Sequence, residues 1–302
     1  MDRIVEVTGG MGGNAFLVRG AEKTALIDCG MAYCASNLIR NIKQALGQLT
    51  LDYILISHSH YDHISAIPYL KKEWPHSRVL GAEYAKRILQ RSNALKTIQE
   101  LNRQAAKLYG VDTLIEYDDN LLKVDDIVTD GDLLELGALT VQIIKTEGHT
   151  RCSLSFWVND ETLFTSESSG CMTRSGKICP AFITSFSETM NSIRICQKLN
   201  PRFIISPHFG LVDEKDRPNY WEKCLLAARE AQELILHFSG LGYDEQAILD
   251  EYEKAFRDAS SETVQPRNAF LLNTRGMIKN VLREKGQGLF FSLDKGSVAR
   301  HN

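Results

Sequence analysis

The stretch His58-Ser59-His60-Tyr61-Asp62-His63 places three imidazoles and one carboxylate within six residues, directly after the apolar run 53–56. Such a run is typical of a short buried strand. Because alternate side chains of a strand share a face, we expect His58 and His60 to converge where the strand ends, whereas Asp62 and His63 project differently beyond a turn. Imidazole nitrogens combined with a carboxylate suit a hydrolytic metal ion. With only eight histidines in 302 residues, the cluster predicts a metal centre and not a chance histidine-rich loop.

Three further candidate ligands lie at the ends of predicted strands. His149, Glu167 and His208 each come just after a run of apolar, strand-forming residues. We expect these three side chains to share one rim with the cluster at 58–63. The other histidines have no such setting and are expected at the surface: His76, His237 and His301.

The composition is that of a globular protein without a membrane span. A hydrophobic content of 43% over 302 residues is enough for a sizeable core, and there is no run of about 18 apolar residues. The N-terminus lacks the basic and apolar regions of a signal peptide. Seven scattered cysteines without a Cys-x-x-Cys pair favour reduced thiols and a cytoplasmic protein. A net charge of -3 weighs against nucleic acid as the main partner.

The order of predicted elements indicates an α/β fold. Apolar patterning and flanking glycines predict strands at 3–8, 14–19, 24–28, 53–56, 139–145, 153–158, 161–165 and 202–206. Helical spacing of apolar residues predicts helices at 34–47, 64–72, within 82–109, and at 219–239, 243–258 and about 267–285. The glycine cluster 9–13 lacks the following helix and Lys-Ser/Thr pair of a phosphate loop, so we expect a flexible hairpin or an active-site loop there.

Two helical parts stand apart from the strand-rich remainder. Residues 82–110 form a predicted insert, which is either structural filler or a cover over the metal cleft. The whole chain divides into a core at 1–217, which contains this insert, and a helical extension at 218–302. The extension is expected to pack on the core and to offer a surface for a homodimer. A basic stripe in the extension is either a solvated helix face or a contact for an anionic cofactor: Arg275, Lys279 and Arg283.

At this point the chain resembles the metallo-β-lactamase-fold hydrolases. The motifs that carry the resemblance are His58-x-His60-x-Asp62-His63, Gly148-His149, Phe164-Thr165-Ser166-Glu167, His208 and the upstream Leu26-Ile27-Asp28-Cys29-Gly30. They cover about residues 1–212. The resemblance implies an αββα sandwich, two mixed sheets packed face to face with helices outside and metals at one edge. The helical insert and the C-terminal extension are additions to it.

The resemblance also implies roles for these residues. His58, His60 and His149 would hold a first divalent ion, and Asp62, His63 and His208 a second. Glu167 falls where the family has a bridging aspartate. Asp28 matches a strand-end carboxylate that orients the cluster without binding metal.

Three departures from the family pattern concern the metal sites. Glu167 is one methylene longer than aspartate, so the bridge is expected to shift or weaken. Ser65-Ala66 replaces a Gly-Gly pair, and Pro207 stands where glycine commonly precedes the last histidine. The ligand set accepts zinc, iron or manganese, with zinc favoured.

A finer resemblance concerns the helical parts. The insert around 100–104 and the element from Pro266 to Lys285 resemble those of the quinolone-signal response thioesterases of pseudomonads, which also have a regulatory role. We therefore expect a metal-dependent hydrolase acting through a metal-bound hydroxide on a small-molecule thioester or ester, including acyl-coenzyme A, with Asp62 as the proton acceptor.

Other functions remain open from the sequence. A phosphodiesterase would want a basic, glycine-rich arm, which the chain lacks. Di-iron oxygen or nitric-oxide reduction favours glutamate where this chain has His60. A regulatory, effector-binding protein with vestigial activity is kept open by Glu167. A β-lactamase is disfavoured by the absence of an export signal.

Overall fold

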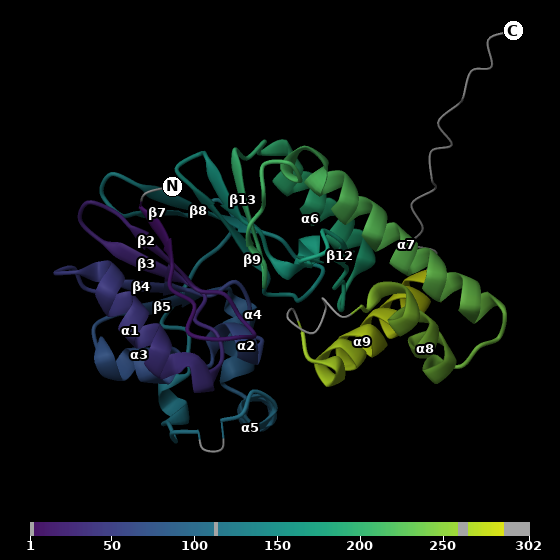
Figure 1. Cartoon of the computed structure of the whole chain (residues 1–302), viewed down its shortest axis with the longest axis horizontal. Helices are drawn as coiled ribbons and strands as arrows, with labels where there is room; N and C mark the ends of the chain where they lie inside the picture. Colours follow the sequence, from purple (N-terminus) through teal and green to yellow (C-terminus); the bar gives the residue numbers. More distant parts are fainter. Residues whose placement is uncertain (1–2, 112–113, 259–264, 287–302) are drawn as a thin grey trace, which may run out of the picture.

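Successive side chains of the first strands point to opposite faces of their sheet, and both faces are covered by other layers. The computed structural model describes residues 3–111, 114–258 and 265–286 (Figure 1). In β2 (Phe16–Arg19), Phe16 and Val18 face a second sheet, whereas Leu17 faces helices. Both faces of this strand are therefore buried, which explains its continuous apolar sequence.

Within the described residues, two six-stranded sheets carry the predicted ligands at the ends of their strands. The first sheet has the order β1 (Ile4–Glu6), β2, β3 (Thr24–Ile27), β4 (Tyr53–Leu55), β5 (Arg78–Gly81), β6 (Asp126–Ile127). The second has the order β14 (Gly210–Leu211), β13 (Phe203–Ser206), β10 (Thr162–Phe164), β9 (Leu154–Val158), β8 (Thr140–Lys145), β7 (Leu133–Glu135). A short antiparallel pair, β11 (Cys171–Met172) and β12 (Ile178–Cys179), follows β10. Both large sheets mix parallel and antiparallel pairs.

The sheets pack face to face and helices cover their outer faces. One buried cluster joins Ile27 and Leu55 of the first sheet to Ile143 and Phe156 of the second. The outer face of the first sheet packs against α1 (Ala35–Leu46), α3 (Ile67–Glu73) and α5 (Ser92–Leu108). The outer face of the second packs against α6 (Phe186–Lys198) and α7 (Tyr220–Gly240). These four layers confirm the predicted αββα sandwich.

Local sequence explains where the main helices begin and end. In α1, Leu38, Ile42 and Leu46 are buried at a spacing of four residues, and the helix ends at Gly47, whose φ is 61°. At the start of α6, the Ser185 side chain accepts a hydrogen bond from the Glu188 backbone N–H.

The C-terminal helices form a further buried cluster with α6. It joins α7, α8 (Glu245–Phe256) and α9 (Arg267–Gly286), which lie together at the lower right of Figure 1. The presence of these C-terminal helices was predicted and is confirmed. The boundary between core and extension at residue 217 stays a prediction. None of the described helices combines the length and apolarity needed to cross a bilayer.

The predicted elements differ from the structure in two ways. The helix expected from residue 64 is two helices, α2 (Tyr61–Ile64) and α3, so helical structure begins inside the histidine stretch. The sequence also missed α6, because the buried face of this helix includes Thr189 and Ser192 and so hides the apolar period. The strands β5, β6, β7 and β14 and the β11–β12 pair were missed as well.

The basic stripe on α9 is not a free cationic surface. Arg275 pairs with Glu245 of α8 at 2.7 Å, and Lys279 lies 3.8 Å from the same carboxylate. Arg283 donates to the Thr184 carbonyl oxygen at 2.9 Å. The stripe therefore helps to hold α9 against its neighbours.

Candidate metal centre

Strand ends and one short helix bring the predicted ligands to one edge of the sandwich. His58 and His60 lie in the loop after β4, and α2 carries Asp62 and His63. The other three follow strands of the second sheet: His149 after β8, Glu167 after β10 and His208 after β13. The strands β8, β10 and β13 run in the same direction, so their carboxyl ends share one rim.

The seven side chains form two groups. The three-histidine group consists of His58, His60 and His149, and the carboxylate group consists of Asp62, His63, Glu167 and His208. Within each group, the candidate ligand atoms lie within 4.8 Å of one another. The structure therefore brings together every residue that the sequence singled out.

The ring nitrogens of the three-histidine group face one another. His60 Nδ1 lies 3.0 Å from His149 Nε2, and the His58 ring centroid lies 4.5 Å from that of His60 and 4.8 Å from that of His149. His149 Nδ1 lies 2.6 Å from the Ala181 carbonyl oxygen, which can only accept a hydrogen bond. The proton of His149 therefore sits on Nδ1, and the Nε2 lone pair points into the group.

Ser57 and Asp28 fix the protonated nitrogen of His58 and His63, as the Ala181 carbonyl oxygen does for His149. Asp28 Oδ2 accepts from Ser57 Oγ at 2.7 Å and lies 2.8 Å from His63 Nδ1. Since the Ser57 hydroxyl donates to Asp28, it accepts from His58 Nδ1, which lies 3.0 Å away. Both histidines are thus protonated on Nδ1, and buried His58 Nε2 has no hydrogen-bond partner among the described residues.

Glu167 lies between the two groups. Its Oε1 is 2.7 Å from His63 Nε2, 3.1 Å from His208 Nε2 and 3.7 Å from His58 Nε2, and its Oε2 is 3.4 Å from His149 Nε2. Asp62 Oδ2 is 3.9 Å from His63 Nε2 and 3.7 Å from His208 Nε2. The extra methylene of Glu167 does not prevent its carboxylate from reaching both groups.

The two groups differ in protonation. Burial lowers the pKa of His58 and His149 from 6.5, and burial beside His149 lowers that of His60 to about 4. Burial opposes charge on His63 as well, but the Asp28 and Asp62 carboxylates raise its pKa well above 6.5. Burial likewise opposes charge on Glu167, yet His149 and His208 hold its pKa well below 4.5.

Backbone strain is concentrated at this edge. Asp28 and His208 have φ values of 54° and 60°, in the left-handed region that non-glycine residues rarely adopt. Such strain persists where surrounding contacts over-determine the conformation, which is common at functional sites. The glycine cluster also reaches the site, because a Cβ on Gly13 would stand 1.9 Å from the Asp62 carbonyl oxygen. Only glycine permits this approach.

The donor set fits divalent cations. In the three-histidine group, the unprotonated Nε2 atoms of His58 and His149 point inward beside His60 Nδ1, and His58 Nε2 has no hydrogen-bond partner among the described residues. In the carboxylate group, protons on His63 and His208 occupy positions that a cation would take between the imidazoles and Glu167. Buried charges of this kind are normally paired or coordinate a metal.

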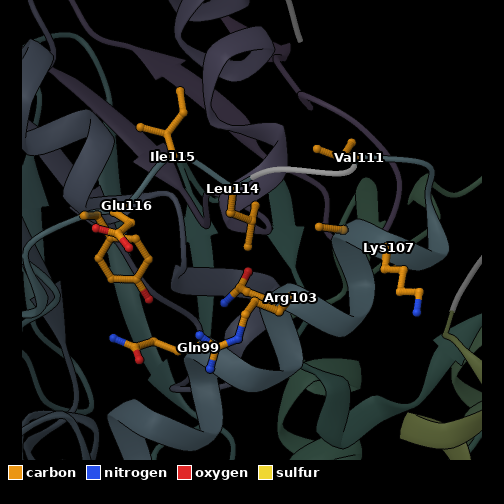
Figure 2. Close-up of a pocket in the computed structure, with 10 residues that line it drawn as sticks. Gln99, Arg103, Lys107, Val111, Leu114, Ile115 and Glu116 are labelled. Atoms are coloured by element: carbon orange, nitrogen blue, oxygen red, sulfur yellow. The ribbon is translucent and has the colours of Figure 1, made fainter.

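Three cavities in the described part of the chain include residues of the two groups, and one of them is much larger than the other two. A pocket of about 340 Å³ contains His60 in its wall, and we call it the His60 pocket. Cavities beside Glu167 and beside His63 are only about 20 and 30 Å³. A larger hollow of about 730 Å³ lies along α5 and residues 114–117 (Figure 2), but none of its lining residues belongs to either group.

Comparison with known proteins identifies the family. The sequence profile described as "Metallo-beta-lactamase superfamily" matches residues 8–208. The chain belongs to this superfamily. A metallo-beta-lactamase fold-containing protein of Sulfurisphaera tokodaii is 29% identical over 206 residues, covering 66% of this chain and 74% of that protein. A hydroxyacylglutathione hydrolase of Aliivibrio salmonicida is 28% identical over 126 residues, covering 41% of this chain and 36% of that protein.

Structural comparison extends the similarity over nearly the whole chain. A metallo-beta-lactamase family protein from Thermus thermophilus superposes with a TM-score of 0.62 at 16% identity, covering 95% of both chains. At this identity the likeness concerns the fold alone. The chain spans about half the length of several other curated relatives in this superfamily.

Sequence reasoning missed several residues around the ligands. Ser57 links Asp28 to His58, and its only signal was its place directly before the histidine stretch. Arg151 and Tyr84 line the His60 pocket from different elements, and nothing in the sequence links them.

Proposed function

We propose that the chain is a dinuclear metal hydrolase that cleaves a small-molecule ester or thioester. The observation that carries this proposal is the pair of ligand groups joined by Glu167. His58, His60 and His149 would hold one ion and Asp62, His63 and His208 the other, with Glu167 between them. Zinc is favoured, and iron and manganese suit the same donors. Divalent ions here would polarise a substrate oxygen and lower the pKa of a water molecule.

The residues of the chain would then orient the reaction. Asp28 and Ser57 keep His58 and His63 in the tautomers that direct Nε2 inward. The Asp62 carboxylate is the candidate proton acceptor, since 11% of its side chain is exposed, more than for any other member of its group. The burial of His58, His63, His149 and Glu167 excludes bulk water from them and strengthens these electrostatic contacts.

The choice of ester or thioester chemistry rests on two supports. One relative in the superfamily carries the name hydroxyacylglutathione hydrolase, a thioester-cleaving activity. The His60 pocket adds an apolar space beside the ligand groups, which suits an acyl chain. A phosphodiesterase would instead need cations for the phosphate backbone, and Arg151 is the only cation that lines this pocket in the described part of the chain.

Metal content and substrate preference test the proposal together. We expect about two divalent ions per purified chain by elemental analysis, and hydrolysis of acyl thioesters or esters in preference to bis(p-nitrophenyl) phosphate. Fewer than one ion per chain, or turnover of the phosphodiester alone, would contradict it.

A histidine pair provides the matched variants. His60→Ala should lower the rate by about 100-fold or more because one ligand of the three-histidine group is lost. His76→Ala should leave the rate unchanged, because His76 is exposed and distant from the ligand groups in the fold. Circular dichroism of both variants checks that the sandwich remains folded.

A further inference from the structure

The His60 pocket combines an apolar wall with one cation. Its apolar side comes from the predicted insert: Tyr84 and Ile88 lie on α4 (Glu83–Leu89), and Ala94, Ile98 and Leu101 lie on α5. The insert is therefore a wall of the cavity that holds a candidate ligand, which favours the covering role over structural filler. A cavity of about 340 Å³ lies in the range of small-molecule sites.

Arg151 supplies the positive charge of the opposite wall. It follows the strand-end ligand His149 by two residues and is exposed. Its guanidinium lies 5.9 Å from the centre of the Tyr84 ring, a cation–π contact across the pocket. Among the described residues Arg151 makes no hydrogen bond or ion pair, and no carboxylate lines the pocket. The guanidinium thus remains able to bind an anion with two parallel hydrogen bonds.

Resting on the proposed function, we propose that the His60 pocket selects medium-chain acyl substrates that carry an anionic group. The acyl chain packs against Ile88, Ala94 and Leu101, and Arg151 binds a carboxylate on that chain. The scissile carbonyl lies at His60. Water supplies oxygen to the acyl carbon, the carbon–sulfur bond breaks, and the thiol leaves with the proton. The apolar wall therefore sets chain length, and Arg151 sets charge preference.

A pair of thioesters with equal chain length tests the role of Arg151. We expect the full chain to hydrolyse suberoyl-N-acetylcysteamine with a KM about 5- to 10-fold lower than that for octanoyl-N-acetylcysteamine. Arg151→Met should remove this difference. The matched control is Arg87→Met, because Arg87 contacts the same Tyr84 ring at 5.5 Å but does not line the pocket. A preference that persists in Arg151→Met overturns the proposal.

A second variant tests the apolar wall. Ala94→Phe should fill part of the cavity and lower the ratio of kcat/KM for octanoyl over acetyl thioester by about tenfold. Gln90→Phe adds the same side chain at an exposed position outside the pocket and should leave that ratio unchanged. An unchanged ratio in Ala94→Phe overturns the assignment of the acyl site.

Binding separates this inference from the proposed function. In calorimetry with the full chain as purified, monomethyl suberate should bind more tightly than 1,8-octanediol, and Arg151→Met should abolish the difference. If no ester or thioester is hydrolysed but this binding pattern appears, the proposed hydrolase is wrong and the pocket assignment stands. If hydrolysis occurs without dependence on chain length or charge, and neither ligand binds, the pocket assignment is wrong and the hydrolase stands.

Discussion

Asp28 shows how one carboxylate outside the ligand groups controls several ligands. It lies in the left-handed region at the end of β3, where both of its oxygens face the loop after β4. One oxygen accepts from the Ser57 backbone N–H, and the other accepts from the Ser57 hydroxyl and faces His63. The same side chain thus determines the tautomers of His58 and His63.

Replacing Asp28 should weaken metal binding while the fold persists. Asp28→Asn removes the charge that raises the pKa of His63, so that pKa should fall in the metal-free protein. We expect metal affinity to drop by about 10- to 100-fold. Chelator competition measures the affinity, and NMR titration measures the pKa.

Asp52→Asn is the matched control for this variant. Asp52 also accepts a backbone hydrogen bond across the first sheet, from Thr24 at 2.8 Å, but it contacts neither ligand group. An equal loss of affinity in both variants would mean that the effect is structural and that Asp28 has no specific role.

Among the helices, α5 packs on the core and is also hydrogen-bonded to it through the buried side-chain amide of Asn102. Asn102 Oδ1 accepts from the Ala32 backbone N–H at 2.9 Å, and Nδ2 donates to the Ser65 hydroxyl at 2.7 Å. Ser65 directly follows α2, and Ala32 begins a short turn of helix before α1. The insert that walls the His60 pocket is therefore positioned by the element that carries Asp62 and His63.

Replacing this amide should destabilise the protein. Asn102→Leu keeps the branching of the side chain but leaves the buried Ala32 N–H unpaired, which should lower the free energy of unfolding by about 1–3 kcal/mol. Lys96→Leu, at an exposed position of α5, should change it by less than about 0.5 kcal/mol. Urea denaturation compares the two, and equal effects would contradict the role assigned to Asn102.

A second contact joins the C-terminal helix to the core. Buried Glu284 of α9 accepts from the Ser185 hydroxyl at 2.8 Å and from the Phe186 backbone N–H at 3.2 Å, at the start of α6. A carboxylate at a helix N-terminus is favoured by the helix dipole and by unpaired N–H groups. Through this contact, α9 is tied to the segment that includes Thr184 of the His60 pocket.

Loss of this contact should loosen α9. Glu284→Ala should lower the free energy of unfolding by about 1–2 kcal/mol because the N-terminus of α6 loses an acceptor. The control is Lys285→Ala, the exposed neighbour on α9. Hydrogen exchange of α9 provides a local readout, and unchanged protection of α9 in Glu284→Ala would contradict this docking role.

At the scale of the whole molecule, the ligand groups place five buried or half-buried histidines at the edge where the two sheets meet. When no cation is bound, these histidines make the free energy of unfolding depend on pH, because their pKa values differ between the folded and the unfolded chain.

Metal-free protein should therefore lose stability in mild acid. The pKa of His60 is about 4 when folded and near 6.5 when unfolded, and the pKa values of His58 and His149 are lowered too. Between pH 6.5 and about 4 the unfolded chain binds protons that the folded chain does not, so stability falls as pH falls. The raised pKa values of His63 and His208 act above pH 6.5, where stability should decline as pH rises. Urea unfolding after chelation at several pH values checks this.

Two histidine variants sharpen the pH experiment. His60→Gln should reduce the acid dependence, whereas His76→Gln should not, because His76 is exposed. Stability that rises steadily as the pH of metal-free protein falls from 6.5 to 4.5 would contradict the protonation states assigned to the three-histidine group.

Local sequence was sufficient for much of the fold and for naming the candidate ligands that the structure brings together. The runs around β2, β3, β4 and β8 have apolar patterns that depend on neighbours in the chain alone, and so do α1 and α7. The spacing of His58, His60, Asp62 and His63 after a strand indicated ligands for the same reason. By contrast, α6 was hidden because its buried face carries Thr189 and Ser192, and the Ser192 hydroxyl donates to the distant Glu147 carbonyl oxygen.

The amino-acid sequence by itself determined which residue types are present to bind a cation and which strand ends carry them. Only the tertiary structure decided that Glu167 reaches both ligand groups, that Ser57 and Asp28 set the histidine tautomers, and that Arg151 faces Tyr84 across the His60 pocket. The physical reason is that hydrogen bonds and ion contacts act over about 3–4 Å. Residues far apart in the chain come within that distance only after the two sheets and the α4–α5 insert have packed.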